Sequence, residues 1–194
     1  MQSDTKYNYG WRILHWLIAV LVLALIPVGL GMASGDEASF WKVLTDRLYN
    51  WHKAIGFAVL WLMVLRIAVK STLTAPPYPG ELSPTLVLFA KWLHHFMYML
   101  LVMAPLSGWA GVTAYPALDI VGGYSLPPLP FVPQDEALAK QLFSIHGTVA
   151  LTLAACVAMH IAAALKHLLV NQDGIFQRMW FGRSGNPPAR PPRP

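Results

Sequence analysis

The last apolar run of the chain, Phe143 to Val170 (FSIHGTVALTLAACVAMHIAAALKHLLV), most narrowly limits what the sequence can fold into. An α-helix needs about 20 apolar residues to cross the hydrocarbon core of a bilayer, and this run is long enough. Three further runs of similar length precede it, at about Ile13–Met32, Trp51–Val69 and Leu86–Trp109. With 56% hydrophobic and 12% charged residues, the chain is unlike a soluble domain. The sequence therefore predicts an all-α fold, a transmembrane four-helix bundle that forms one domain over residues 11–180.

The basic residues indicate how such a bundle is oriented. With four spans, both termini lie on the same side of the membrane. That side holds ten basic and three acidic residues, whereas the other side holds four basic and six acidic residues, in line with the net charge of +5. Because basic residues favour the cytoplasmic side, we expect both termini to be cytoplasmic. The excess of basic residues then reflects membrane topology, and no nucleic-acid binding is expected.

Less hydrophobic segments flank and join the runs. Residues 1–10 form a polar N-terminal lead, and residues 181–194 are basic and proline-rich, which is typical of a disordered tail. Residues 31–50 are expected to form a mixed-charge outer loop, and the long segment 111–140 is expected to cover the outer end of the bundle. The first run has some features of a secretory signal peptide, but it is long for one and its removal would leave three spans. We therefore expect it to remain as a helix.

Two histidines interrupt the last apolar run. His146 and His160 are 14 residues apart, and a helix that turns about 100° and rises about 1.5 Å per residue brings them to nearly one face, roughly 21 Å apart. Ionisable side chains at membrane depth are costly and are functional candidates for that reason. An imidazole there that binds no ligand needs another hydrogen-bonding partner.

Two more histidines match these two levels. In a bundle whose helices alternate in direction, His15 lies at the inner side, near the level of His160, and His52 lies at the outer side, near the level of His146. Small residues stand one turn from each histidine, which either serves close helix packing or leaves room for a flat macrocycle. Neutral imidazole is a good iron ligand. The topology therefore predicts the pairs His15/His160 and His52/His146, each able to hold the iron of one planar macrocycle.

Further polar side chains lie near the inner level. His94 and His95 are adjacent on the third span, so they point about 100° apart and cannot both face one partner. Each is either a hydrogen-bonding residue of the bundle or a ligand contact. His167, Lys91 and Arg66 are candidates to contact a haem propionate or a quinone, although the two basic residues also fit ordinary positive-inside flanks.

Two single residues limit the local chemistry. Cys156 is the only cysteine, so the chain has no disulfide framework and no C-x-x-C-H site for covalent haem attachment. We expect it to be a small packing residue. Pro105 is expected to kink or end the third helix.

The segments RILHWLIA, YNWHKAIG, HHFMYMLLVMAPLSGW and SIHGTVALTLAACVAMHIAAALKH together resemble the bacterial cytochrome b561 family, over about residues 9–170. The resemblance implies a multi-pass inner-membrane protein with two haem b groups, whose ligands come from the first, second and fourth helices. Carried over residue by residue, these ligands are His15, His52, His146 and His160. Members of the family pass electrons between the periplasmic side and ubiquinone, and some oxidise superoxide. One departure concerns the third span, where Lys91 stands in place of the first histidine of an A-H-x-x-H pattern.

The resemblance leaves several functions open. The first is an electron relay between a periplasmic donor, either superoxide or a small redox protein, and ubiquinone in the lipid, which makes the protein a quinone-linked oxidoreductase. The second is a haem-bearing membrane anchor for a larger periplasmic dehydrogenase or hydrogenase. The third is a haem or metal transport module, although transporters tend to have broken helices and repeated halves.

Overall fold

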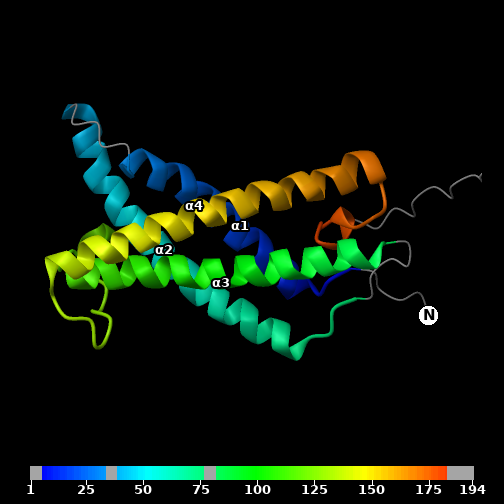
Figure 1. Ribbon diagram of the computed structural model, residues 1–194, viewed down its shortest axis with the longest axis horizontal. Coiled ribbons are helices and arrows are strands. Elements are labelled where there is room, and N and C mark those ends of the chain that lie inside the picture. Colours follow the sequence, from blue (N-terminus) through cyan, green and yellow to red (C-terminus); the bar gives the residue numbers. More distant parts are fainter. Residues whose placement is uncertain (1–5, 34–38, 77–81, 183–194) are drawn as a thin grey trace, which may run out of the picture.

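The computed structural model describes residues 6–33, 39–76 and 82–182, with the side chains of residues 39–46 outside that description. Four long helices dominate the described chain (Figure 1): α1 (Tyr9–Ala33), α2 (Ser39–Thr72), α3 (Pro84–Ala114) and α4 (Glu136–Lys166). Three short elements accompany them: the 3-10 turns η1 (Val121–Gly123) and η3 (Phe176–Arg178), and the π-helical turn η2 (His167–Asn171). All four long helices are long and apolar enough to cross a membrane. The prediction of an all-α transmembrane four-helix bundle is confirmed.

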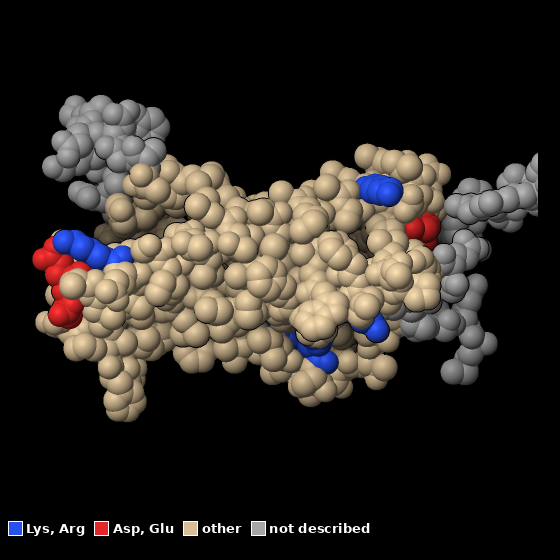
Figure 2. Space-filling view, in the orientation of Figure 1, with Lys and Arg blue, Asp and Glu red and all other residues tan. Residues whose placement is uncertain are grey.

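The outer surface of the bundle is apolar. Large side chains such as Trp61, Leu88 and Leu151 are each more than half exposed. In water such a surface would favour aggregation, whereas lipid tails solvate it. Figure 2 shows the charged side chains of one face gathered toward the two ends of the molecule, with an uncharged stretch between them.

The centre of the bundle is a small core to which all four helices contribute. Met63 of α2 is fully buried. Around it lie Ile18 and Val22 of α1, Val59 of α2, Leu100 of α3, and Leu153 and Cys156 of α4. Cys156 is therefore a buried packing residue, as expected. In α1, α2 and α4 these core residues follow or precede the histidines, so the core separates two histidine levels.

Neighbouring helices differ in how closely their backbones approach. α1 packs on α2, α2 packs on α3, and α3 packs most extensively on α4. By contrast, neither the pair α1 and α4 nor the pair α2 and α4 has such extensive backbone contact. Side chains, or a group held between side chains, therefore fill the space that separates α4 from α1 and α2.

The outer loop predicted for residues 31–50 is wrong, because α2 already begins at Ser39. The mixed charges of the stretch hid a helical pattern of apolar residues at Phe40, Val43, Leu44 and Leu48, with no proline or glycine to interrupt it.

Pro105, which was expected to kink or end the third helix, does not end it, since α3 continues to Ala114. The hydroxyl of Ser107 donates to the carbonyl oxygens of Met103 and Ala104, at 2.8 and 2.9 Å. Such side-chain hydrogen bonds help a membrane helix to continue past a proline.

The segment between α3 and α4 is tied to the adjacent helix ends. Trp109 Nε1 donates to the Pro127 carbonyl at 2.8 Å, and Lys53 Nζ of α2 donates to the Ala117 carbonyl at 2.9 Å. Asp119 and Ser125 form an isolated antiparallel bridge within the segment. These contacts hold the segment against the ends of α2 and α3.

The segment after α4 returns to the start of α1. Tyr7 N donates to the Arg178 carbonyl at 3.2 Å, and the Trp16 indole N–H donates to the Met179 carbonyl at 2.9 Å. Both described ends of the chain therefore lie at the same end of the bundle (Figure 1). Residues 1–5 of the predicted lead and residues 183–194 of the predicted tail lie outside the described residues.

Candidate functional site

Two pairs of histidines lie at two levels of the bundle. We call the level nearer the described ends of the chain the inner level, and the other the outer level. His15 of α1 and His160 of α4 have ring centroids 6.2 Å apart, and their planes make an angle of 80°. His52 of α2 and His146 of α4 have ring centroids 6.0 Å apart and planes at 85°. All four rings are half-buried. The structure thus brings together the same pairs that the topology predicts, while their role as iron ligands remains a prediction.

Both separations suit a metal held between two rings. Two imidazoles that bind one metal from opposite sides, each at about 2 Å, have ring centres roughly 6 Å apart once the ring radii are added. Each ring plane contains its own metal–nitrogen bond, so the two planes can be perpendicular. A flat group also needs room beside the rings. A Cβ atom added at Gly56, one turn from His52, or at Gly147 would meet nothing within 4 Å.

The outer pair has one ring that is fixed and one that has a free nitrogen. His146 Nδ1 lies 2.8 Å from the Ala104 carbonyl, which can only accept, so this nitrogen donates and Nε2 keeps its lone pair for a metal. The lack of a side chain at Gly108 of α3 leaves space for the His146 ring, because a Cβ added there would lie only 3.1 Å from His146 Nδ1. His52 Nδ1 is buried and has no partner among the described residues. A buried nitrogen without a partner is a group that a ligand can satisfy.

The inner level holds a third histidine. The ring centroid of His94 on α3 lies 5.1 Å from that of His160, and His94 Nδ1 lies 2.5 Å from the carbonyl oxygen of Ala90. His95 instead lines a shallow hollow of about 390 Å³ on the outside of α3, together with Leu88, Lys91 and Trp92. The two adjacent histidines therefore face different surroundings, as their spacing predicts.

Arg66 is buried at the inner level, with 8% of its surface exposed. Its Nε donates to the Tyr98 hydroxyl at 2.8 Å, its Nη1 donates to the Trp11 carbonyl at 3.2 Å, and its Nη2 lies 3.4 Å from His15 Nδ1. The sequence placed Arg66 at this end of the bundle but did not distinguish a membrane flank from a buried contact. It also missed Tyr98, which stands one turn after His94 on the same helix and could have been found by that spacing.

His167 forms an ion pair that the sequence did not predict. In η2 the helix widens to a π-turn, and His167 Nδ1 lies 2.6 Å from Asp173 Oδ2. The amide nitrogen of Asn171 lies 3.2 Å from the same ring nitrogen. Both members of the ion pair are largely buried, with side-chain exposures of 14% and 21%.

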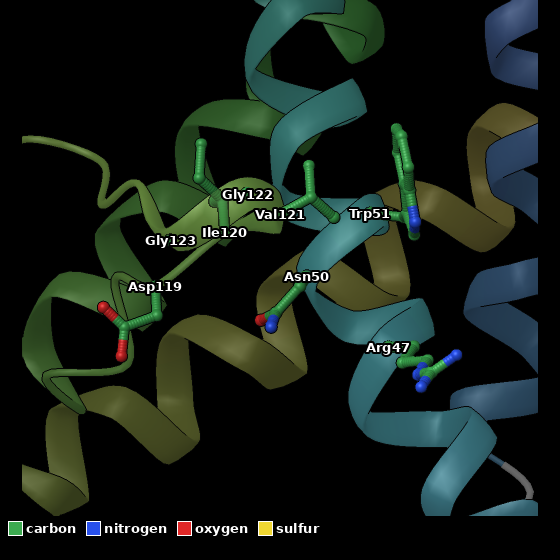
Figure 3. Close-up of a pocket in the computed structure, with 8 residues that line it drawn as sticks. All are labelled: Arg47, Asn50, Trp51, Asp119, Ile120, Val121, Gly122 and Gly123. Carbon is green, nitrogen blue, oxygen red and sulfur yellow. The ribbon is translucent and has the colours of Figure 1, made fainter.

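A hollow of about 580 Å³ lies at the outer end, between α2 and the segment that follows α3. Figure 3 shows Arg47, Asn50 and Trp51 on α2 and Asp119 to Gly123 on the opposite segment. Gly122 and Gly123 have φ angles of 79° and 75°, which side chains other than glycine rarely adopt. Trp51 directly precedes His52 in α2, so the hollow borders the turn of α2 that carries His52.

The remaining cations described at this end are already engaged. Lys140 pairs with Glu136 at 2.8 Å on the surface of α4, and Lys53 donates to a backbone carbonyl. The side chain of Lys42 lies outside the described residues. Arg47 is therefore the described cation at this end that is exposed and borders the hollow.

Comparison with known proteins gives one family and two relatives. The model of the prokaryotic cytochrome b561 family matches residues 6–182. The chain is 28% identical to "Cytochrome b561 homolog 2" of Escherichia coli K12, over 95% of this chain and 96% of that protein. It is 29% identical to "Probable superoxide oxidase CybB" of Yersinia pestis, over 93% of this chain and 98% of that protein.

Proposed function

The chain belongs to the prokaryotic cytochrome b561 family, and from this premise we propose that it relays single electrons from a periplasmic donor to ubiquinone through two haem b groups. Family membership and four membrane spans make it a multi-pass protein of the bacterial inner membrane. Membership likewise makes it a membrane cytochrome that binds haem b and takes part in electron transfer. We propose in addition that it binds two haems, that its donor is periplasmic and that its acceptor is ubiquinone.

The observation that carries the proposal is the presence of two separate histidine pairs, with open space at Gly56 and Gly147 beside the outer one. His15 with His160, and His52 with His146, would each hold the iron of one haem. When bound, haem supplies reversible one-electron chemistry at each level. The protein contributes the ligands, a tautomer fixed by the Ala104 carbonyl, and an apolar core that keeps water from the space between the levels. If both termini are cytoplasmic, as the basic residues predict, the His52/His146 pair would lie at the periplasmic side.

The quinone would bind at the inner level. Ubiquinone takes up two electrons and two protons to become the quinol, so its site needs a hydrogen-bonding group and a route for protons. His167, held by Asp173 beside the terminal segments of the chain, is one candidate. The other is the hollow on α3 bordered by Lys91 and His95, which would face lipid in the membrane. Lys91 would there contact a quinone carbonyl in place of the family's histidine.

The donor would approach the outer hollow. Superoxide loses one electron to become dioxygen, with no proton transfer, so it needs only a positive charge to attract it and a short path to the outer haem. Arg47 supplies the charge, and the hollow lies next to the helix segment that carries His52. A relative of this chain is named as a probable superoxide oxidase, which makes superoxide the first donor to test.

A membrane-anchor role is the second candidate. Phe131 on the outer segment is fully exposed with a φ angle of 66°, and Tyr124 is 73% exposed. Exposed aromatic residues are typical of protein interfaces, so a soluble dehydrogenase subunit could bind there. Transport has less support, because α1 to α4 run without interruption over their described lengths.

The test uses purified holoprotein in detergent with stopped-flow spectroscopy of the haem bands. Superoxide should reduce the oxidised protein, and a short-chain ubiquinone should reoxidise it. Arg47→Gln should slow reduction by superoxide several-fold, because a steering charge mainly affects the association rate. Lys140→Gln, which removes a cation already paired with Glu136, should leave that rate unchanged. Equal rates in wild type and Arg47→Gln would contradict entry at this hollow. A protein that quinone oxidises but superoxide does not reduce, and that copurifies with a soluble subunit, would favour the anchor role.

A further inference from the structure

We propose that Arg66 raises the reduction potential at the inner histidine pair above that at the outer pair, and so drives electrons inward. This inference rests on the proposed function, because it requires a redox group at each pair. Arg66 is a positioning residue in this account: it acts on the inner site through charge and through contact with His15, without ligating the iron.

The charge of Arg66 is buried and is not neutralised by a carboxylate. The ion pairs in the described parts of the chain are Lys140–Glu136 and His167–Asp173, and neither includes it. Its two hydrogen bonds go to a phenol and a carbonyl oxygen, and its third contact is with the His15 imidazole at 3.4 Å. None of the three is a carboxylate, so none of them neutralises the positive charge. In a medium of low dielectric such a charge acts strongly over a few ångströms.

One histidine of each pair, His146 at the outer level and His15 at the inner level, differs in the group that faces its Nδ1. At the outer pair, His146 Nδ1 donates to the Ala104 carbonyl, which strengthens the imidazole as a ligand and favours the oxidised metal. At the inner pair, His15 Nδ1 faces the Arg66 guanidinium at 3.4 Å. A guanidinium has no acceptor, so it cannot accept a hydrogen bond from His15 Nδ1 as the Ala104 carbonyl does from His146 Nδ1. At the inner pair a positive charge therefore stands where the outer pair has a carbonyl oxygen. An added electron is therefore stabilised at the inner pair.

Tyr98 holds Arg66 in this position. Its hydroxyl accepts from Arg66 Nε at 2.8 Å, and its ring lies under the ammonium of Lys70, at 4.6 Å from the ring centroid. At the outer level the nearest described cation in sequence is Lys53, next to His52, and its ammonium group turns to the Ala117 carbonyl. The buried positive charge is thus concentrated at the inner level.

The direction of transfer follows from this difference. One electron leaves the outer pair and one arrives at the inner pair, with no bond made and no proton moved between them. Two such electrons, together with two protons taken up at the inner side, convert one quinone to the quinol. The donor that supplies each electron is the one-electron donor of the proposed function.

The experiment is a spectroelectrochemical titration of the purified holoprotein, with haem counted in each variant by the pyridine haemochrome assay. Wild type should show two one-electron components. Arg66→Gln should lower the higher midpoint by at least the equivalent of a tenfold change in the reduction equilibrium, which is about 59 mV for one electron, and leave the lower midpoint in place. Arg66→Lys keeps a positive charge at this position, so its higher midpoint should stay close to that of wild type. Lys166→Gln, which removes an exposed cation from the last turn of α4, should shift neither midpoint, since solvent and salt screen an exposed charge.

His52→Ala assigns the components, because the single midpoint that remains should be the higher one. Two haems with both midpoints unshifted in Arg66→Gln would overturn this inference and leave the proposed function standing. A wild-type protein with fewer than two haems would overturn the proposed function itself. If Arg66→Gln loses its inner haem, Tyr98→Phe decides: a lower value for the higher midpoint supports the inference, and an unchanged value overturns it.

Discussion

Replacing Gly108 tests whether the position of His146 matters for the outer site. A Cβ at Gly108 would lie 3.1 Å from His146 Nδ1 and 3.2 Å from Cε1, whereas carbon atoms in contact prefer about 3.5 Å or more. In Gly108→Ala the ring therefore needs to move by only about 0.4 Å. The hydrogen bond to the Ala104 carbonyl, now 2.8 Å, would lengthen to about 3.2 Å, which is still within range.

The alanine variant should be close to neutral in stability. Removing glycine from a helix interior gains about 0.5–1 kcal/mol, which offsets the small displacement of the ring. Valine adds two branches beyond Cβ, and a helix leaves a β-branched side chain almost one rotamer. We expect overpacking to cost about 1–3 kcal/mol, with a further cost of about 1 kcal/mol for the broken hydrogen bond.

The assay is haem content together with the thermal loss of the haem band in detergent. Gly108→Ala should keep two haems per chain, whereas Gly108→Val should lose or spectrally alter the outer haem. Gly31→Val is the matched control, because a Cβ at Gly31 would meet nothing within 4 Å. If Gly108→Val keeps both haems with unaltered spectra and the thermal midpoint of wild type, then His146 does not hold the outer group as argued.

Two further variants separate the site from the core. His52→Ala should reduce the haem content from two to one per chain and leave the inner component of the redox titration in place; retention of both haems would exclude the His52/His146 pairing. Met63→Ala removes the fully buried side chain of the central core and should lower the free energy of unfolding by about 2–5 kcal/mol. The expected result is a lower thermal midpoint, with the haem content of the folded protein unchanged. A midpoint equal to that of wild type would mean that lipid or a bound group fills the space left by Met63.

The sequence predicts the fold well because the membrane imposes a length and an apolar composition on every span. The two levels follow from helical rise and alternating direction, so the neighbours of His15 and His52 could be predicted without coordinates. Hydropathy misses the start of α2 at Ser39, because the mixed charges there resemble those of a loop. Helix length in this stretch is set by a pattern that hydropathy alone does not measure.

Contacts that depend on the rotation of helices about their axes were beyond the sequence. Arg66 and Tyr98 lie 32 residues apart on different helices, and no local pattern links them. The His167–Asp173 pair depends on the widened turn η2 and on the return of the chain after it. His94 could be placed at the inner level, but its closeness to His160 required the relative rotation of α3 and α4.

The most direct test of the electron-relay account is the amount of b-type haem per chain in the purified wild-type protein, measured by the pyridine haemochrome assay. Two histidine pairs predict a value close to two. A value close to one, or close to zero in protein produced with ample haem, would contradict the account, and the paired histidines at both levels would then need another explanation.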